Sequence, residues 1–453
     1  MQLTNSFVLL LAGFQCVFTS PTYAIFVDLM AGWVLSHRRR FVTELIFSSG
    51  SLHNGHHSRY HRFFSGAIWS LDLVCSILAR LLVATFAATG LIELCVDDTL
   101  CRKRGLTVYG TGMHHDPLNS SRAMKLVSWG HDWVVLCLIV RCPFWAPTKV
   151  WSLPIAFRLY RNRQGWTRSK DGKRSRTSPN PHHRTRPELA MELIQMVATW
   201  FPDRQLLVSG DSAYGGESVL SKLPSNVDLI SHVHPAGAMY APPDPAPAGQ
   251  RGARRKKGPR LPGMAAWAMD AKQPWKTLTF DQFGLHATLQ IKTRKALYYK
   301  AGKDRMLHIV LVRDAIGKRP DQMFYCTRLD WSARQILSAY ACRWSIEVTF
   351  QNCKQLLGFA DPANRTPKAV QRTAPMALVL YSLMIAWFHG TGHRHVKFPD
   401  RPWYRKKAEP SFADILTTLR RLSWTEKYRT LLPKSRPLRK CVSQLTEIAC
   451  RAG

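Results

Sequence analysis

Three short, largely apolar runs, each bounded by polar turns, constrain the fold of this chain more than any other feature. They are residues 91–96, 133–140 and 205–209. Runs of this length between turn residues are typical of buried β-strands. The first run is followed by Asp97 and Asp98, and the third leads through Gly210 into Asp211. The sequence therefore predicts an α/β protein with a buried sheet, two of whose strands end in carboxylates.

Other segments show helical or strand patterns. Helical periodicity predicts helices at residues 7–18, 23–36, 41–47, 69–86, 187–200 and 411–422. Further strands are predicted at residues 106–112, 226–233 and 323–327, with alternating strands between residues 277 and 312. The chain thus begins with a helical region, continues as strands and helices, and contains a second group of strands.

Four chemically different side chains recur along residues 340–354. Tyr340 is followed at offsets of 3, 7 and 14 by Arg343, Glu347 and Lys354. With about 100° per residue, a single helix places all four within an arc of roughly 60°. A carboxylate is a hard oxygen ligand for Mg²⁺, and Arg and Lys bind phosphate oxygens. The alternative is a solvated helix face on which Arg343 and Glu347 form an ordinary ion pair.

The spacing of these four residues resembles the Y-R-E-K signature of DDE transposases encoded by bacterial insertion sequences. The resemblance implies that Glu347 is the last of three catalytic carboxylates, the others being Asp97 and Asp211. It also implies that these carboxylates hold two Mg²⁺ ions, for which Mn²⁺ substitutes. The family's Asp-any-Thr motif selects Asp97 over Asp98 as the first ligand. An aspartate at a strand end also serves as a turn residue or helix cap, and this alternative stays open.

The same resemblance implies a ribonuclease-H-like fold, α/β or α+β overall, in which helices flank a mixed sheet. The expected parts are an N-terminal helical, DNA-binding domain at 1–88, a catalytic domain at 89–240 and 321–395, a β-rich insertion at 241–320, and a C-terminal helical region at 396–453. A helical layer that covers the sheet is the alternative for the first part. Within the insertion, Trp267 or Trp275 is a candidate to stack on an unpaired base, and burial in the core is the alternative.

Charge indicates a polyanionic partner. The chain has 64 Lys and Arg against 29 acids, a net charge of +35. Ribosomal and membrane-surface proteins share such charge, but together with the acidic triad it favours DNA. Basic tracts at residues 37–40, 161–186 and 251–260 are expected on exposed connections. The predicted DNA contacts are Tyr340, Arg343, Lys354, Arg38, Arg39, Arg40, Arg254, Arg255, Lys256 and Lys257.

Cysteine usage and hydropathy argue for a cytoplasmic protein. The 11 cysteines include no Cys-x-x-Cys pair, so scattered thiols are expected rather than disulfides or a zinc ribbon. The histidines at 53, 56, 57 and 61 lack a neighbouring acid at a ligand spacing, which favours a polar or DNA-facing loop over a metal site. The apolar run near residue 7 lacks a preceding cation, so export is not expected. No apolar run reaches the length that crosses a bilayer, so no membrane partner is expected.

Together these features predict a cut-and-paste transposase in the bacterial cytoplasm, associated with the nucleoid. Its expected partners are double-stranded DNA, as transposon ends and as target, and a second copy of the chain in a homodimeric synaptic complex. The main alternative is a catalytically silent or domesticated transposase that acts as a DNA-binding protein. A cellular nuclease or resolvase of the same fold is the third possibility, which the N-terminal helices and the long insertion disfavour.

Overall fold

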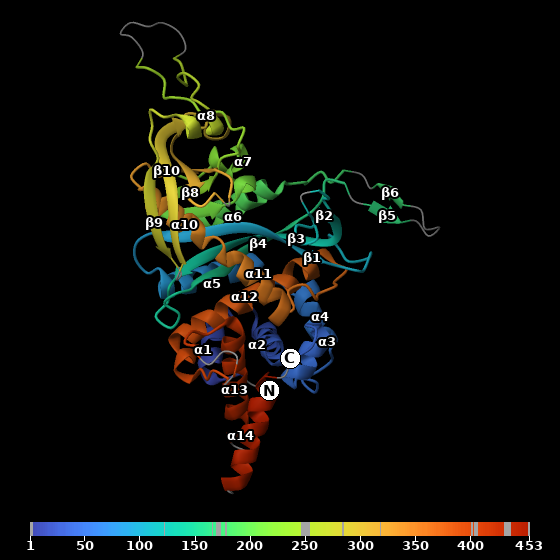
Figure 1. Ribbon diagram of the computed structural model, residues 1–453. Helices are drawn as coiled ribbons and strands as arrows, with labels where there is room; N and C mark the ends of the chain where they lie inside the picture. The colour runs from blue at the N-terminus through green and yellow to red at the C-terminus, as the bar shows by residue number, and fades with distance from the viewer. Residues whose placement is uncertain are drawn as a thin grey trace.

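The computed structural model describes residues 3–121, 123–164, 166–168, 174–176, 179–245, 254–282, 285–317, 319–399, 402, 406–429 and 436–451. The predicted basic tracts at 161–186 and 251–260 lie partly outside these residues. The described part is an α/β structure in which helices flank a large mixed sheet (Figure 1). The predicted fold class is therefore confirmed.

The sheet has ten strands within the described residues. One path through it runs β2-β3-β1-β7-β8-β12-β11-β10-β9, and β4 pairs with β3. The strands are β1 (Ile92–Arg102), β2 (Gly112–His115), β3 (Val127–Arg141), β4 (Val150–Tyr160), β7 (Leu206–Gly210), β8 (Val227–His232), β9 (Lys276–Gln282), β10 (Leu285–Leu297), β11 (Met306–Asp314) and β12 (Gln322–Cys326). A separate short hairpin joins β5 (Trp166–Arg168) to β6 (Arg174–Arg176).

The three apolar runs form adjacent central strands. β1 pairs antiparallel with β3 and parallel with β7, and β7 pairs parallel with β8. Eleven consecutive residues of β3, from Gly130 to Val140, are buried, as expected for a strand covered on both faces. The predicted strands at 205–209, 226–233 and 323–327 are confirmed within one residue at each end, and the one at 133–140 is confirmed as part of β3, which begins six residues earlier, at Val127. The sequence signal was strong here because both faces of these strands are apolar.

Helices cover both faces of the sheet. They are α1 (Asn5–Ala12), α2 (Ser20–Leu35), α3 (Val42–Ser49), α4 (Ser58–Ser65), α5 (Leu71–Phe86), α6 (Arg186–Trp200), α7 (Glu217–Leu220), α8 (Met264–Met269), α9 (Tyr299–Gly302), α10 (Ala333–Cys342), α11 (Ser345–Leu356), α12 (Pro367–Gly390), α13 (Phe412–Arg429) and α14 (Arg436–Arg451), with 3-10 turns η1 (Gln15–Val17), η2 (Ser212–Gly215) and η3 (Gly392–His395). α6 begins with a capping box, in which Thr185 and Glu188 satisfy each other's backbone N–H groups.

Two buried contacts fix α11 and α12 against β4. The Ser152 hydroxyl on β4 lies 2.5 Å from the Ser345 hydroxyl on α11, and Ser382 on α12 donates to the Pro154 carbonyl at 2.8 Å. On β1, the Cys95 thiol lies 3.2 Å from the same Ser152 hydroxyl. Because side chains alternate along a strand, Asp97 lies on the same face of β1 as Cys95, the face that α11 covers.

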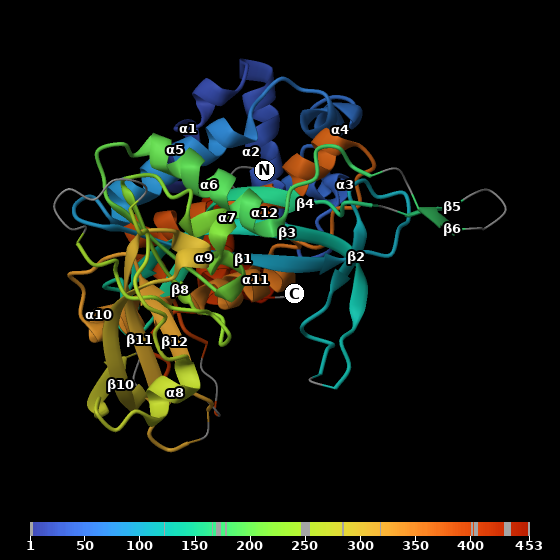
Figure 2. The same ribbon diagram turned by 90° about the horizontal axis from the view of Figure 1, so that it is seen from above.

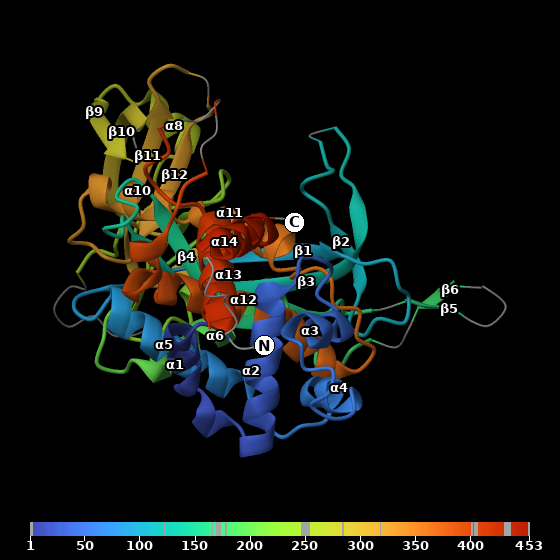
Figure 3. The ribbon, with the colours of Figure 1, turned by 90° about the horizontal axis from the view of Figure 1, so that it is seen from below.

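The N-terminal helices share one hydrophobic core with the rest of the protein. Buried Phe7 and Trp33 belong to the same core cluster as the sheet and α12. The Trp33 indole donates to the Leu357 carbonyl at the end of α11, at 2.8 Å. Figures 2 and 3 show α1 to α4 gathered beside α12, on the side of the molecule away from β9 to β11. The boundary at residue 88 stays a prediction, because a shared core does not separate two domains.

The strands of the predicted insertion join the main sheet. β9, β10 and β11 pair in sequence, and β11 pairs with β12, which pairs with β8. At the tip, the buried ammonium of Lys292 donates to the carbonyls of Trp267, Ala268 and Asp270 at 2.8–3.2 Å. Trp267 is fully buried, so the structure supports the core alternative for this side chain and not the base-stacking role.

Four local predictions from the sequence are wrong. Residues 106–111 form turns rather than a strand, and β2 begins only at Gly112. α4 forms inside the His- and Arg-rich stretch that was expected to be a loop, because its buried Tyr60, Phe63 and Phe64 give that stretch an apolar face. β1 continues through Asp97 and Asp98 to Arg102, so the first strand does not end at these aspartates as expected. The expected single helix across residues 340–354 is two helices, α10 and α11.

α12 is long and apolar enough to span a membrane by length and composition, and no other helix of the described residues passes that test. Its most apolar window is 89% buried inside the protein, against β4 and α5. It is therefore a core helix of this fold. All 11 cysteines are free thiols, as the sequence predicted.

Candidate active site

The parallel pairing of β1 and β7 brings two predicted catalytic residues together. Val96 of β1 lies opposite Gly210 of β7, and Asp97 and Asp211 follow these residues directly. A Cβ atom at Gly210 would lie 2.9 Å from the Tyr214 Cβ and 3.2 Å from the Val96 Cγ1. Glycine therefore permits the close approach of β7 to β1 at the point where the carboxylates emerge.

Asp97 and Asp98 lie on opposite faces of β1 and have different partners. Asp97 accepts a hydrogen bond from Arg343 Nη1 at 2.6 Å, on the face that α11 covers. Asp98 accepts one from the Tyr214 hydroxyl at 2.6 Å and lies 3.5 Å from Arg186 Nε, at the start of α6. Asp97 is thus on the face of β1 that α11, the helix of Glu347, covers, and Asp98 is on the other face.

The charged form of Asp97 is disfavoured in this site. Burial raises the pKa of Asp97 to about 7, against the opposing effect of Arg343, and the negative charges of Asp211 and Asp98 raise it further. This dependence shows that the three aspartates lie close enough to repel one another. Additional positive charge would therefore stabilise the Asp97 carboxylate, which lies in the middle of β1 beside the end of β7.

Arg343 is placed by the junction between α10 and α11. Backbone N–H groups from Arg343 to Glu347 donate to carbonyls three residues earlier, for example Arg343 to Tyr340 at 3.0 Å and Glu347 to Trp344 at 3.1 Å. These tighter turns interrupt the α-helical register. The Arg343 side chain is 12% exposed and points to Asp97. Burial opposes its positive charge, but Tyr340, Asp97 and Asp211 outweigh this effect and raise the pKa of Arg343.

The other three residues of the predicted signature, Tyr340, Glu347 and Lys354, differ in burial and in their neighbours. The Tyr340 ring packs against His232 and Phe324, with centroids 4.8 and 4.9 Å apart, and burial raises its pKa to about 12. Glu347 is exposed, and its pKa is raised by partial burial against the opposing effect of Arg343. Lys354, on α11, lies close enough to β1 for its charge to oppose the rise that burial causes in the pKa of Cys101.

A second polar cluster lies on the α6 face of β1. Asp132 of β3 is almost fully buried and accepts from Arg186 Nε at 2.5 Å. Burial raises the pKa of Asp98 to about 6, and Asp132 raises it further. His114 lies 3.9 Å from Asp132, and its burial lowers its pKa to about 4, so it is neutral at pH 7. Arg186 thus neutralises two carboxylates at once on this face.

The predicted DNA contacts outside the signature differ in exposure. Arg38 and Arg39 are exposed, and so are the four cations of residues 254–257. Lys257 lies over the Tyr240 ring at 4.1 Å. Arg40 is buried, and its guanidinium donates to the Ser36 and Leu356 carbonyls. The structure therefore contradicts a phosphate contact for Arg40, whose donors close the ends of α2 and α11.

The predicted Mg²⁺ site is supported by the types of side chain present, but not by their arrangement. Among the residues that the structure describes, no group of three His, Cys, Asp or Glu side chains is arranged to hold a metal ion. Asp97 and Asp211 nevertheless supply hard oxygen donors on neighbouring strands, and their mutual repulsion is the condition that a divalent cation relieves. These oxygen donors are of the type that Mg²⁺ prefers. In this structure, however, Asp97 is hydrogen-bonded to Arg343, and Glu347 is exposed to solvent.

Sequence reasoning missed four residues of this region. Asp132 and Arg186 form the buried ion pair on the α6 face, Tyr214 donates to Asp98, and Trp344 is 63% exposed between Arg343 and Glu347. Only Asp132 gave a signal, as an acid at the start of an apolar run. The others acquire their partners through tertiary contacts, which no local pattern records.

The structure is thus an α/β protein with a mixed sheet in which two aspartates emerge from neighbouring parallel strands. The DDE superfamily endonuclease family model matches residues 14–300, which include Asp97 and Asp211 and end before Glu347. The chain therefore belongs to the DDE superfamily endonuclease family.

Other comparisons give less. No curated protein matches the chain. Among solved structures, the chain is similar to a piggyBac transposase in a synaptic complex with hairpin DNA, solved by cryo-EM. The match has 12% identity and a TM-score of 0.39, and it covers 94% of this chain and 76% of the other. At this TM-score the likeness carries no argument about function.

Proposed function

We propose that this chain is a DDE DNA transposase of the Y-R-E-K type from a bacterial insertion sequence. It binds the terminal inverted repeats of its element and catalyses metal-dependent cleavage and strand transfer. The observation that carries the proposal is the contact of Arg343 with Asp97 at 2.6 Å. A residue of the signature thereby meets the first aspartate beside the second, as a site that handles both metal and phosphate requires.

In the proposed site, Asp97, Asp211 and Glu347 are the residues that hold divalent metal. Two Mg²⁺ ions, when bound, supply Lewis-acid activation of a water or 3′-hydroxyl and stabilise the leaving oxygen. Once the negative charge of Asp97 is neutralised, Arg343 releases this carboxylate and binds a phosphate oxygen near the scissile bond instead. Tyr340, held by His232 and Phe324, positions Arg343. Lys354 contributes positive charge about two turns beyond Glu347 on α11.

The proposed partners are double-stranded DNA and a second copy of the chain. Transposon ends and target DNA both present phosphates to the exposed cations Arg38, Arg39 and residues 254–257. A homodimer brings two such sites together in the synaptic complex. The proposed compartment is the bacterial cytoplasm, where the nucleoid supplies the substrate.

A DNA-binding protein without nuclease activity is the second candidate. The exposed position of Glu347 and the absence of a three-ligand group among the described residues favour it. In this reading the Arg343–Asp97 ion pair is a permanent structural contact and the basic surface provides the function.

One experiment separates the two candidates. Purified protein is incubated with linear DNA that carries the element's ends, with Mg²⁺, Mn²⁺ or EDTA. The proposal expects nicking at the ends that requires metal and is lost in Glu347→Gln. Because Glu347 is exposed, this variant is expected to fold and to bind DNA normally. DNA binding without cleavage, with the same melting temperature in Mg²⁺ and EDTA, would identify the non-catalytic candidate.

A further inference from the structure

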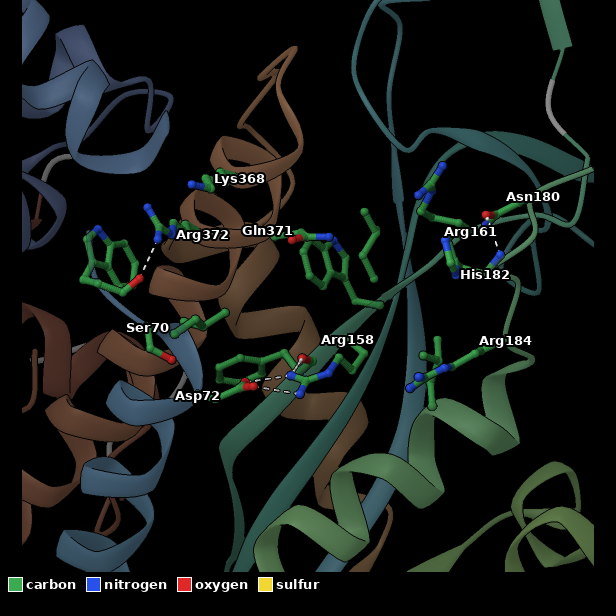
Figure 4. Close-up of a pocket in the computed structure, with 16 residues that line it drawn as sticks. Ser70, Asp72, Arg158, Arg161, Asn180, His182, Arg184, Lys368, Gln371 and Arg372 are labelled. Atoms are coloured by element: carbon green, nitrogen blue, oxygen red, sulfur yellow. Dashed lines mark hydrogen bonds and ion pairs between the residues drawn. The ribbon is translucent and has the colours of Figure 1, made fainter. Parts of the chain in front are cut away.

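A cavity of about 610 Å³ lies beside β4. Its walls come from the start of α5, from the end of β4 and the loop before α6, and from the first turns of α12 (Figure 4). None of Asp97, Asp211 and Glu347 lines it. It is therefore separate from the candidate active site.

The cavity is strongly basic. Of the residues that line it in the described part of the chain, five are Lys or Arg and one, Asp72, is acidic. Figure 4 shows Arg161, His182 and Arg184 on one wall and Lys368 and Arg372 on the opposite wall. Cations that face each other across an open space repel, so their arrangement needs an anionic ligand or an internal partner.

Some of these cations have partners within the protein. Arg158 donates to Asp72 at 2.8 Å and to Glu192 at 2.8 Å, and Arg184 pairs with the same Glu192. Arg372 donates to the Ala67 carbonyl at 2.8 Å and so fixes the connection between α4 and α5. These three arginines are chiefly structural.

Two cations remain directed to solvent on opposite walls. Lys368 is exposed on the first turn of α12 and is paired with no carboxylate of the described residues. Arg161 is exposed at the end of β4, where its guanidinium lies 5.1 Å from the Tyr109 ring centroid. The described residues on either side of this connection are in contact, since the Asn180 N–H donates to the Arg163 carbonyl at 2.7 Å.

Two further donors favour an anion here. The side chain of Thr366, the N-cap residue of α12, makes no capping hydrogen bond. The N–H groups of the first turn are therefore not neutralised by this side chain and carry the positive end of the helix dipole. The Trp133 indole N–H, in the lining of the cavity, is buried and has no hydrogen-bond partner among the described residues. An isolated buried donor is unfavourable unless a ligand or water satisfies it.

We propose that this cavity binds the phosphate backbone of DNA, outside the segment that is cleaved, with Lys368 and Arg161 as the phosphate contacts. The inference rests on the proposed function for the identity of the nucleic acid. DNA is favoured over a small phosphate compound because the free cations are exposed and face each other across a wide opening. Sites for small phosphates instead enclose the ligand with backbone N–H groups of glycine-rich loops, and no glycine of the described residues lines this cavity.

The test measures DNA affinity as a function of salt by fluorescence anisotropy. The double variant Lys368→Gln/Arg161→Gln is compared with Lys222→Gln/Lys406→Gln, which removes two exposed cations elsewhere. The cavity variant is expected to bind duplex DNA on the order of tenfold more weakly and to reduce the slope of log K against log salt by about 2, since each phosphate contact contributes about 0.9. The control is expected to match the wild-type chain. Melting temperatures check that both variants are folded.

Unchanged affinity and slope in the cavity variant would overturn the inference. Calorimetric titration with pyrophosphate is the second arm: binding that is lost in the cavity variant, with DNA affinity unaltered, would assign the site to small phosphates and reject DNA. Hydrogen exchange of the wild-type chain gives an independent check, with DNA expected to protect residues 180–184 and 366–372. If wild-type protein binds DNA through the cavity but never cleaves it, the proposed function fails and this inference stands.

Discussion

Arg343 donates a hydrogen bond to Asp97 at 2.6 Å, across 246 positions of the chain. The two side chains are 12% and 18% exposed, so the pair is largely desolvated. Removing Arg343 alone leaves the Asp97 carboxylate buried without its cation, which costs more than removing both groups.

We therefore expect Arg343→Gln to lower the free energy of unfolding by about 2 kcal/mol at pH 8 in the absence of metal. Adding Asp97→Asn to this variant is expected to restore most of the loss. Chemical denaturation of the wild-type chain, both single variants and the double variant measures the coupling. Additive effects would show that the pair contributes no interaction energy.

Asp97 makes the stability of the protein depend on pH. Its pKa in the folded state is about 7, against about 4 in the unfolded chain. The folded state thus binds the proton more tightly, and this contribution to stability is fully present below about pH 4 and is lost as the pH rises to about 7.

Asp97→Asn is accordingly expected to be more stable than the wild-type chain above pH 7, with the difference vanishing near pH 4. The expected size is on the order of 1–3 kcal/mol, at about 1.4 kcal/mol for each unit of pKa. Urea denaturation between pH 4 and pH 8 in EDTA measures it. A difference that is constant over this range would contradict the assigned pKa. The variant Glu93→Gln, on the same strand and paired with Arg141, serves as a control.

Arg186 neutralises the buried carboxylate of Asp132 as well as Asp98. Arg186→Gln leaves Asp132 buried without a cation, and we expect a loss of about 3 kcal/mol in the free energy of unfolding. Asp132→Asn in the same chain is expected to recover at least half of it. The measurement is equilibrium unfolding at pH 8, and equal stability of the single and double variants would be inconsistent with the pairing.

Trp344 is 63% exposed beside Glu347, and Val348 on the same helix is 50% exposed. If DNA lies at this site as proposed, the indole is available to stack on a base or pack on a sugar. Trp344→Ala is expected to weaken DNA binding roughly tenfold and to leave the melting temperature within about 2 °C of the wild-type value. Trp331→Ala, at a tryptophan before α10, gives the matched loss of an indole. Equal DNA affinity in the two variants would rule out the role for Trp344.

Much of the sheet could be predicted because its central strands carry their own signal. The runs that became β1, β3 and β7 are apolar on both faces, so their burial follows from local composition. The helix before Asp211 was equally clear from its helical periodicity, and in the structure a capping box of Thr185 and Glu188 begins it. Residues 106–111 failed because their apolar character is too weak to decide between strand and turn.

The sequence by itself determined the kinds of group at the candidate site: aspartates that follow apolar runs and a spaced set of Tyr, Arg, Glu and Lys. It also determined the basic charge that favours DNA. Only the tertiary structure decided which face of β1 each aspartate uses, that Arg343 contacts Asp97, and that Arg40 is buried. The physical reason is that periodicity and propensity act over a few neighbours, whereas burial and charge pairing depend on residues that folding brings together from distant parts of the chain.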